Sequence, residues 1–277
     1  MYNLGIHDCS SETAYMHVWD ETTASRGSQE IASCLRKYLA SSGNQGSKTN
    51  LILWSDSCGG QNRNIKVALR LLEFVQDPSV SYNIITQKFL ESGHSFLPND
   101  SDFGDIEKRL KHHSEVYIPQ QYYDVIREAR SSSKPFKVVE MTQDDFFSTA
   151  TLEKAIVNRK TSTSKEPISW MNAKQIQVRR DHPLFLFFRY THDPLPDDAW
   201  IEISLAKRGQ KIAGIIGTKL FDAPRSITTA KKKDLTSLLP LVPPIHHHFF
   251  QSIRAGGKAE NDVDGHRAEL DFEVEDE

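Results

Sequence analysis

The sequence has few cysteines, no long apolar run and no recognisable leader segment. Its 277 residues include three cysteines, Cys9, Cys34 and Cys58, without C-x-x-C spacing, which argues against a disulfide framework or a zinc ribbon and favours a reducing compartment. No apolar stretch approaches the roughly 18 residues that a membrane helix needs. The first residues lack the basic region, apolar core and cleavage site of a secretory signal. We therefore expect an intracellular protein, nuclear or cytoplasmic, that is not secreted and has no membrane partner.

The charge is unevenly distributed along the chain. Residues 255–277 carry nine acids against Lys258 and Arg267, a net charge of −7, and residues 1–254 carry +4. The acidic tail is typical of a disordered, solvating segment. The mildly basic remainder is compatible with a nucleic-acid partner without requiring one, because affinity for phosphates depends on local Lys and Arg clusters. No zinc finger, helix-turn-helix or internal repeat is recognisable.

The hydrophobic patterns predict an α/β protein. In order, the patterns indicate strands at 2–7 and 13–19, a helix capped by Ser28, a strand at 51–54, a helix at about 63–74, a strand at 82–90 and a helix at about 101–112. After the serines at 131–133 the pattern changes to a smaller mixed unit and a helical end. The chain is therefore expected to divide into a core at 1–130, a mixed α+β and helical region at 135–254, and the acidic tail at 255–277.

A strand that ends on an acid gives the first candidate site residue. The apolar run at 51–54 stops at Ser55 and Asp56, and ligands of open α/β proteins bind at the carboxyl ends of strands. Metal ions that act on a phosphodiester need carboxylates from different elements, because these hard cations prefer oxygen ligands. We therefore expect Asp56 to bind a divalent cation, Mg²⁺ or Mn²⁺, together with acids from another element.

Further acids gather where the helix at 101–112 begins. Asp100 and Glu107 are seven residues apart, so on a regular helix they share a face that is able to turn toward Asp56. Asp102 and Asp105 lie on other faces. In the alternative interpretation, Asn99 or Asp100 caps the helix and the acids complement its dipole. The pattern predicts Asp56, Asp100 and Glu107 as catalytic residues and metal ligands.

The segment after Asp56 has several interpretations. Asn62, Arg63 and Asn64 precede a helix, where they would contact a nucleic-acid backbone or hold Asp56 in place. The structural alternative for Gly59-Gly60 is a tight turn that needs positive φ. The spacing of these glycines matches neither the P-loop motif nor the G-x-G-x-x-G motif of nucleotide-binding proteins. A nucleotide-binding phosphotransferase is nevertheless a third hypothesis.

Other side chains have a functional and a structural interpretation. His94 would orient a metal-bound carboxylate or a water, or else be a hydrogen-bonded structural histidine. The histidines at 246–248 point in different directions on a helix and fit a packed helix start. The lysines at 231–233 would contact DNA phosphates or form a solvated helix end. Phe185, Phe187 and Phe188 are expected in the core and not as a base-stacking platform.

Several segments resemble one family. YNLGIHD, WDETTASRGSQEIASCL, WSDSCGGQNRN, GHSFLPNDSDFGDIEK and the later VPPIHHHFFQSI are similar to uncharacterised, transposon-derived eukaryotic proteins that resemble DDE transposases with an RNase H-like fold. The resemblance covers about residues 2–253. Its most specific motifs are S-D-x-C-G-G-Q-N-R-N and G-H-S-x4-D-x2-F-x2-I-E. The resemblance implies a mixed sheet flanked by helices, ancestral metal-dependent DNA cleavage and strand transfer, and DNA as a partner.

The resemblance also assigns roles by motif. Asp56 matches the second acid of the family, and Asp100 or Glu107 matches the third, with Asp100 preferred because it follows the G-H-S turn. The first acid of the family lies on a strand that precedes YNLGIHD, between the strands at 2–7 and 51–54, and the printed chain begins at that segment. Neither Asp8 nor Asp20 matches the motif. The expectation is an RNase H-like sheet that lacks its first strand.

These implications leave two functions open. The chain is expected to be a transposase-derived protein that is inactive or incomplete as a DDE-type enzyme. The alternative is a domesticated DNA-binding or protein-interaction module without catalysis. Transposases commonly act as assemblies, so an oligomer is compatible with either function.

Overall fold

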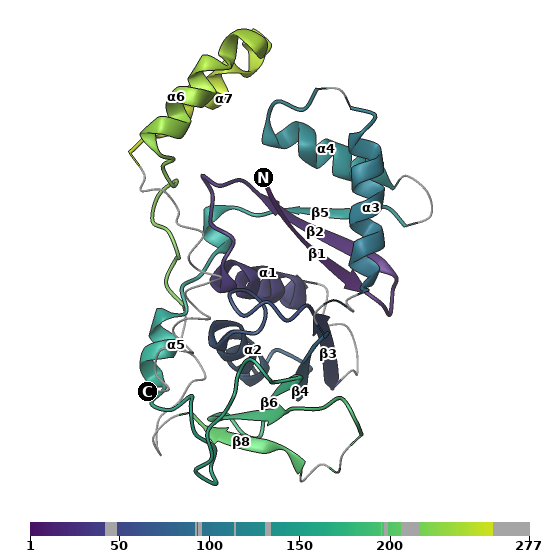
Figure 1. Cartoon of the computed structure of the whole chain (residues 1–277), viewed down its shortest axis with the longest axis vertical. Coiled ribbons are helices and arrows are strands. Elements are labelled where there is room, and N and C mark those ends of the chain that lie inside the picture. Colours follow the sequence, from purple (N-terminus) through teal and green to yellow (C-terminus); the bar gives the residue numbers. More distant parts are fainter. Residues whose placement is uncertain are drawn as a thin grey trace. The chain divides into compact units, whose positions relative to one another are not determined.

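The computed structural model describes residues 1–41, 49–91, 93, 96–113, 115–130, 134–194, 196, 199–205 and 217–256. The chain forms two compact units, each made from separate segments (Figure 1). Unit 1 consists of the described parts of Met1–Ser25, Phe96–Phe146 and Phe221–Asn261, and unit 2 of those of Arg26–Ser95 and Phe147–Leu220.

The fold class is mixed α/β, as the sequence predicts. Each unit contains one sheet with parallel and antiparallel pairs, accompanied by helices. The expected division near residue 130 differs from this arrangement, because segments from both sides of that position contribute to each unit. The RNase H-like arrangement stays a prediction. No helix in the described part of the chain is long and apolar enough to cross a membrane.

Unit 1 contains a three-stranded sheet in the order β1-β2-β5. Its strands and its two long helices are β1 (Tyr2–Asp8), β2 (Thr13–Trp19), α3 (Pro98–Leu110), α4 (Pro119–Ala129) and β5 (Lys137–Glu140). The expected hairpin is confirmed, since β1 and β2 pair antiparallel, and β5 then pairs parallel to β2. Helix α4 has no counterpart among the predicted elements.

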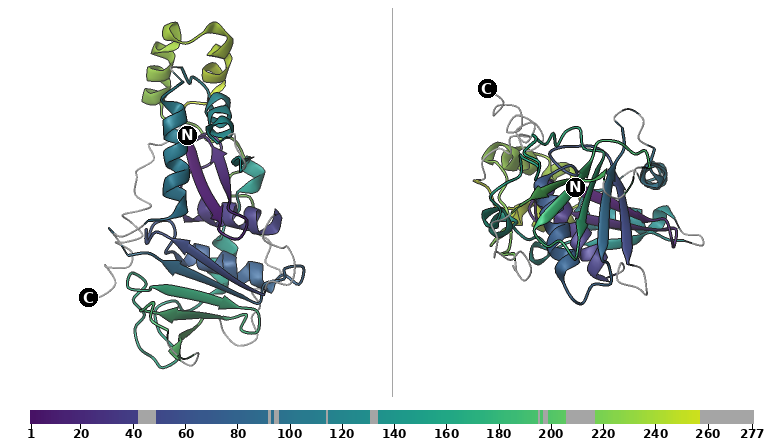
Figure 2. Two further views of the ribbon diagram at one scale, coloured as in Figure 1. Left: turned by 90° about the vertical axis from the view of Figure 1, so that its right-hand side faces the viewer. Right: turned by 90° about the horizontal axis from the view of Figure 1, so that it is seen from below.

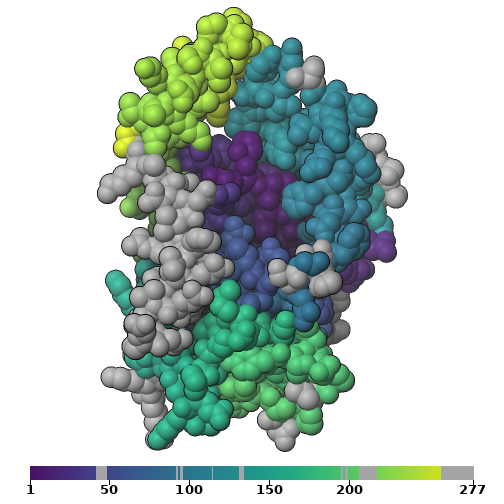
Figure 3. Space-filling model, viewed as in Figure 1, coloured from purple at the N-terminus to yellow at the C-terminus, as the bar shows by residue number. Residues whose placement is uncertain are grey.

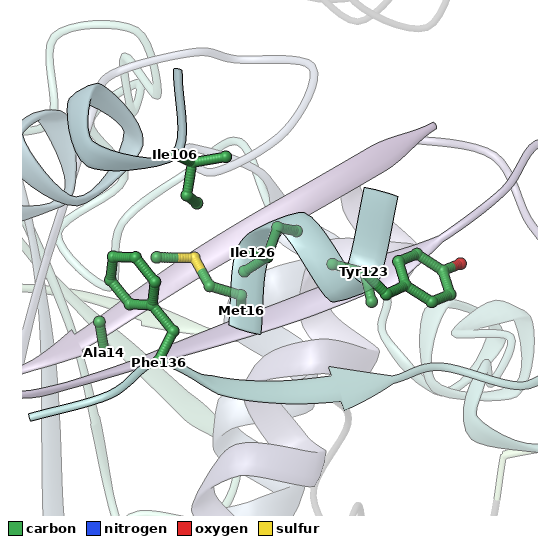
Figure 4. Packing of buried hydrophobic residues seen from close by; sticks show 7 residues of the cluster. Ala14, Met16, Ile106, Tyr123, Ile126 and Phe136 are labelled. Carbon is green, nitrogen blue, oxygen red and sulfur yellow. The ribbon is translucent and has the colours of Figure 1, made fainter. Parts of the chain in front are cut away.

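The core of unit 1 forms between the sheet and its two helices. Met16 of β2, Ile106 of α3 and Ile126 of α4 are at most 2% exposed, and Phe136 packs with them just before β5 (Figure 4). Burying such a side chain stabilises a fold by about 1.5–3 kcal/mol. In the space-filling view, α3 and α4 form a teal surface beside the purple strands β1 and β2 (Figure 3).

Helix α3 approaches β1 closely at Gly5. A Cβ atom at this position would lie 2.9 Å from Asn99 Nδ2 and 3.2 Å from the ring of Phe103. A hydrogen atom in place of a side chain therefore permits this packing distance. The residue at position 5 thus contributes to where the acidic helix α3 lies on its sheet.

The C-terminal helices belong to unit 1. Its remaining elements are η1 (Gln143–Asp145), α6 (Thr229–Ser237), η3 (Leu239–Leu241), η4 (Pro244–His246) and α7 (His247–Ser252). Helices α6 and α7 lie side by side (Figure 1). Lys232 donates to the carbonyl oxygens of Gln251 and Ile253 at 3.0 and 2.8 Å, and Lys231 pairs with Glu21 at 2.7 Å. Two lysines of the 231–233 cluster are therefore held by partners within the unit.

Unit 2 contains a five-stranded sheet in the order β3-β4-β6-β7-β8. Its elements are α1 (Ser28–Ser41), β3 (Asn50–Ser55), α2 (Ile65–Gln76), β4 (Ile84–Phe89), α5 (Ala150–Ala155), β6 (Gln175–Arg179), β7 (Phe185–Arg189) and β8 (Ile201–Ser204). Only the β3–β4 pair is parallel. Helix α1 packs on α2, which packs on the sheet (Figure 2). Phe187 and Phe188 are fully buried, which confirms the prediction that they belong to the core, whereas Phe185 is only partly buried.

Strands β1 and β3 each lie at an edge of their sheet. On β3, the large apolar side chains of Ile52 and Trp54 are 56% and 47% exposed. Long apolar edge strands are uncommon in soluble proteins because they invite pairing with another strand.

Candidate functional site at the end of strand β3

Asp56 lies directly after β3, at the carboxyl end of the parallel pair β3–β4. Its Oδ1 accepts hydrogen bonds from the Cys58 N–H at 3.1 Å and the side-chain amide of Asn62 at 2.8 Å. Its Oδ2 accepts no hydrogen bond from the described residues, and the side chain is exposed. One carboxylate oxygen is therefore fixed in place while the other is available to a ligand.

The polar residues after Asp56 divide between two structural tasks. Asn62 holds Asp56, which confirms one of its two interpretations. Asn64 is the N-cap of α2: its side chain accepts from the Lys66 N–H and donates to the Gly59 oxygen, each at 3.0 Å. The expectation of positive φ at Gly59-Gly60 is wrong, because neither glycine is among the described residues with positive φ. Both glycines are buried, so the turn is compact without left-handed backbone.

A hollow of about 400 Å³ opens at this end of unit 2. Its walls come from the loop after β3, the end of β4, the turn before β6 and the end of β7. Ser57, Arg63, Lys174 and Tyr190 supply polar groups to the lining, and Glu91 pairs with Lys174 at 3.1 Å. The hollow therefore has more positive than negative charge in its walls.

Arg63 is the most deeply buried charge of this hollow, at 6% exposed. Its Nη1 donates to the Met171 oxygen, and its guanidinium carbon lies 5.1 Å from the centre of the Phe89 ring. Within the described residues, its Nε is buried without a hydrogen-bond partner, and no carboxylate forms a salt bridge with it. Burial lowers the pKa of the Arg63 guanidinium, and the negative charge of Asp56 opposes that shift.

The two candidate acids of α3 lie in unit 1 and differ in their partners. Asp100 Oδ2 accepts a hydrogen bond from the Leu97 N–H at 2.8 Å. Asp100 therefore helps to cap the helix from its third position, as the capping interpretation has it, but the N-cap is Leu97, so the prediction of Asn99 or Asp100 as the N-cap is wrong. Glu107 is exposed and accepts no hydrogen bond from a described residue. Asp56 belongs to unit 2, so the convergence of the three carboxylates stays a prediction.

The buried acid of α3 is Asp102, which the sequence pattern did not single out. It is 1% exposed, and its Oδ1 accepts from Arg130 Nη2 at 2.7 Å while its Oδ2 lies 2.7 Å from His7 Nδ1. An ionised carboxylate only accepts hydrogen bonds, so in this pair Nδ1 of His7 is the donor. Arg130 also contacts Asp105 at 2.7 Å. The signal was available, since Asp102 stands one helical turn before the buried Ile106.

The histidine predictions have different outcomes. His94 lies outside the described residues. The helix start predicted at 246–248 is confirmed, because η4 ends at His246 and α7 begins at His247. His246 packs against the ring of Tyr117, and Nε2 of His247 contacts the Val242 oxygen at 2.8 Å. These two side chains therefore have structural partners.

The described residues contain no group of three or more His, Cys, Asp or Glu side chains placed to hold a metal ion together. An exposed carboxylate with one available oxygen still fits Mg²⁺, which is usually held by one or two carboxylates together with water and phosphate. Comparison of the chain with protein-family models, curated proteins and solved structures gave no match.

Proposed function

We propose that this chain is a transposase-derived DNA-binding protein in which Asp56 holds a Mg²⁺ or Mn²⁺ ion against a phosphodiester. The proposal depends mainly on the Asp56 carboxylate, whose Oδ1 is fixed by two donors and whose Oδ2 is available. Its position at the carboxyl end of parallel strands is where α/β proteins bind ligands. The positive hollow beside it, with Arg63 and Lys174 in its walls, supports a phosphate-bearing partner.

A second metal ligand from α3 belongs to the proposal as well. Glu107 now fits this role better than Asp100, because an oxygen of Asp100 already accepts the Leu97 N–H. When bound, the metal would polarise a phosphate oxygen and neutralise its charge. Cleavage and strand transfer are the ancestral reactions that the resemblance implies.

A metal titration tests this proposal. At a Mg²⁺ concentration about ten times Kd, linkage stabilises the metal-binding form by about 1.4 kcal/mol, and thermal unfolding should shift by a few degrees. Asp56→Asn should abolish the shift, because the neutral amide is a poor ligand for this cation. Asp77→Asn is the matched control, since it removes the same charge from the loop after α2 and should keep the shift. Equal responses of the wild type and Asp56→Asn would refute the proposed ligand.

The second candidate function is a DNA-binding or interaction module without catalysis. The observation in its favour is that acids of α3 serve the fold: Asp100 caps the helix, and Asp102 is bound by Arg130 and His7. This function predicts DNA binding that is unchanged by chelation of divalent cations, measured by fluorescence anisotropy. The metal-dependent function predicts that EDTA and Asp56→Asn weaken DNA binding to a similar extent.

A further inference from the structure

Unit 2 contains two arginines of similar burial that differ in their partners. Arg70 is 3% exposed and forms a salt bridge with Glu73 at 3.1 Å. Arg63 is 6% exposed, and no described carboxylate pairs with it. A buried cation without a counter-charge is costly, because its desolvation is not offset by attraction to an anion. Among the described carboxylates, Asp56 acts on Arg63 through its charge without forming a salt bridge, so the attraction that offsets the burial of Arg63 is weaker than that of a direct pair.

Arg63 lines the hollow, and its Nε is a buried atom of that side chain. Its Nη1 is engaged by the Met171 oxygen and its flat face by the Phe89 ring, while Nε has no described hydrogen-bond partner. These two contacts fix the orientation of the guanidinium. An oriented arginine loses little entropy when an anion binds, since its rotamer is already restricted.

Other groups in the hollow suit an oxyanion. Lys174 adds a second cation, which shares its charge with Glu91, and the hydroxyl of Ser57 is a further donor. A guanidinium recognises phosphate through paired N–H donors at fixed spacing. A volume of about 400 Å³ accommodates a phosphate together with part of the group that carries it.

We propose that this hollow binds a phosphate group, with the guanidinium of Arg63 as a donor and Lys174 as a supporting cation. The choice of phosphate as the anion, and of a DNA backbone as its source, rests on the proposed function. The binding of an anion by Arg63 stands independently of any metal on Asp56. The subsite would therefore hold one phosphate of a bound strand while Asp56 acts through a metal on another oxygen.

The first experiment uses the unmodified chain and inorganic phosphate. In a ¹⁵N-correlated NMR spectrum, the Nε–H signal of Arg63 should shift on phosphate addition and should not shift with chloride at equal ionic strength. The spectrum of Arg63→Lys assigns that signal by its disappearance. An Arg63 Nε–H signal that phosphate leaves unchanged would overturn the proposal.

The second experiment measures DNA binding in EDTA, so that no metal contributes. Arg63→Met should weaken binding about tenfold and lower the slope of log K against log salt by about one, as expected for a lost phosphate contact. Arg36→Met is the matched control, because it removes a cation of α1 that lies outside the hollow, and it should bind DNA as the wild type does. Equal affinities of Arg63→Met and Arg36→Met would refute the DNA backbone as the source of the phosphate.

A third experiment distinguishes a DNA backbone from a free phosphate compound as the source of the phosphate. Together with the metal titration, it also distinguishes the phosphate subsite from the metal site on Asp56. An oligonucleotide with a neutral methylphosphonate backbone should bind the wild type and Arg63→Met equally, because it presents no charged phosphate. A shift with inorganic phosphate, without any effect of Arg63→Met on DNA binding, would assign the subsite to a free phosphate compound. A phosphate response together with an Asp56→Asn variant that keeps its Mg²⁺ shift would refute the metal function and leave the subsite in place.

Discussion

The charged side chains at the start of α3 in unit 1 and those after β3 in unit 2 differ in how completely they are paired. In unit 1 the acids at the start of α3 are used by the fold: Asp100 accepts the Leu97 N–H, and Asp102 lies between His7 and Arg130. In unit 2 the charges after β3 are incompletely paired, with one free oxygen on Asp56 and one free donor on Arg63. A charge whose partners are within the chain stabilises the fold, whereas one without them is available for a ligand.

This difference shows that an acidic residue in a sequence motif does not by itself identify a metal ligand. Both units carry acids at an element boundary, and the motifs of both resemble the same family. The contacts show that the acids of α3 are not equivalent, because Asp102 is buried and paired while Glu107 is exposed. The candidate site is therefore better defined by the missing partners than by the acidic residues alone.

The largest expected effect contrasts Asp102 with Asp56. Asp102→Asn should destabilise the protein by about 3 kcal/mol, since removing one charge of a buried ion pair leaves its partner uncompensated. Asp56→Asn should change stability by less than about 0.5 kcal/mol in the absence of metal, as exposed substitutions usually do. Urea unfolding of both variants in EDTA measures the two values. Similar losses in both variants would remove the contrast between the units.

A smaller effect distinguishes the two candidate acids of α3. Asp100→Ala should cost about 1 kcal/mol, because the Leu97 N–H loses its acceptor. Glu107→Gln should be nearly neutral for stability, since its carboxylate has no described hydrogen-bond donor. Thermal unfolding of the pair gives the comparison. If Glu107→Gln is the more destabilising change, then Glu107 serves the fold and Asp100 again becomes the better ligand candidate.

The smallest effect concerns pH and the β1–β2 turn. Burial raises the pKa of Asp8, but hydrogen bonds from Ser10 and Ser11 outweigh it and leave the pKa below its ordinary value. The resulting stability is present above the unfolded-state pKa of about 3.9 and is lost as pH falls through the lower folded-state value. Asp8→Asn should remove this acid dependence, worth less than about 1 kcal/mol. The measurement is the free energy of unfolding between pH 2 and 5. Its dependence on pH should be weaker in Asp8→Asn than in the wild type if these contacts contribute.

Local patterns predicted most elements and the β1–β2 hairpin, but not the pairing of strands that are distant in sequence. The alternation at 2–7 and 13–19 and the apolar run at 51–54 gave strands close to the observed ones. Helix α4 was missed, although Pro119 at its first position and the buried pair Tyr123 and Ile126 are typical of an amphipathic helix. The parallel pairing of β2 with β5 joins Tyr15 to Lys137, and no local pattern specifies such a distant contact.

The candidate site was predictable only in part. Asp56 follows from a strand that ends on an acid, and its support by Asn62 was one of two interpretations. The burial of Arg63 was not predictable from the sequence, because its partner Met171 and the lining residue Lys174 come from a segment more than 100 positions away. The His7–Asp102–Arg130 contacts likewise join three distant segments, and their formation depends on the tertiary fold.

The pairing of β2 with β5 has a consequence for how the chain folds. The hairpin of β1 and β2 is synthesised well before β5, and its sheet is completed only after Lys137 has been made. Contacts between residues so far apart in sequence form slowly, because a long loop must close before they can stabilise anything. The intervening segment belongs largely to unit 2, so early products of translation would expose the buried face of β2 and depend on chaperones until both units are complete.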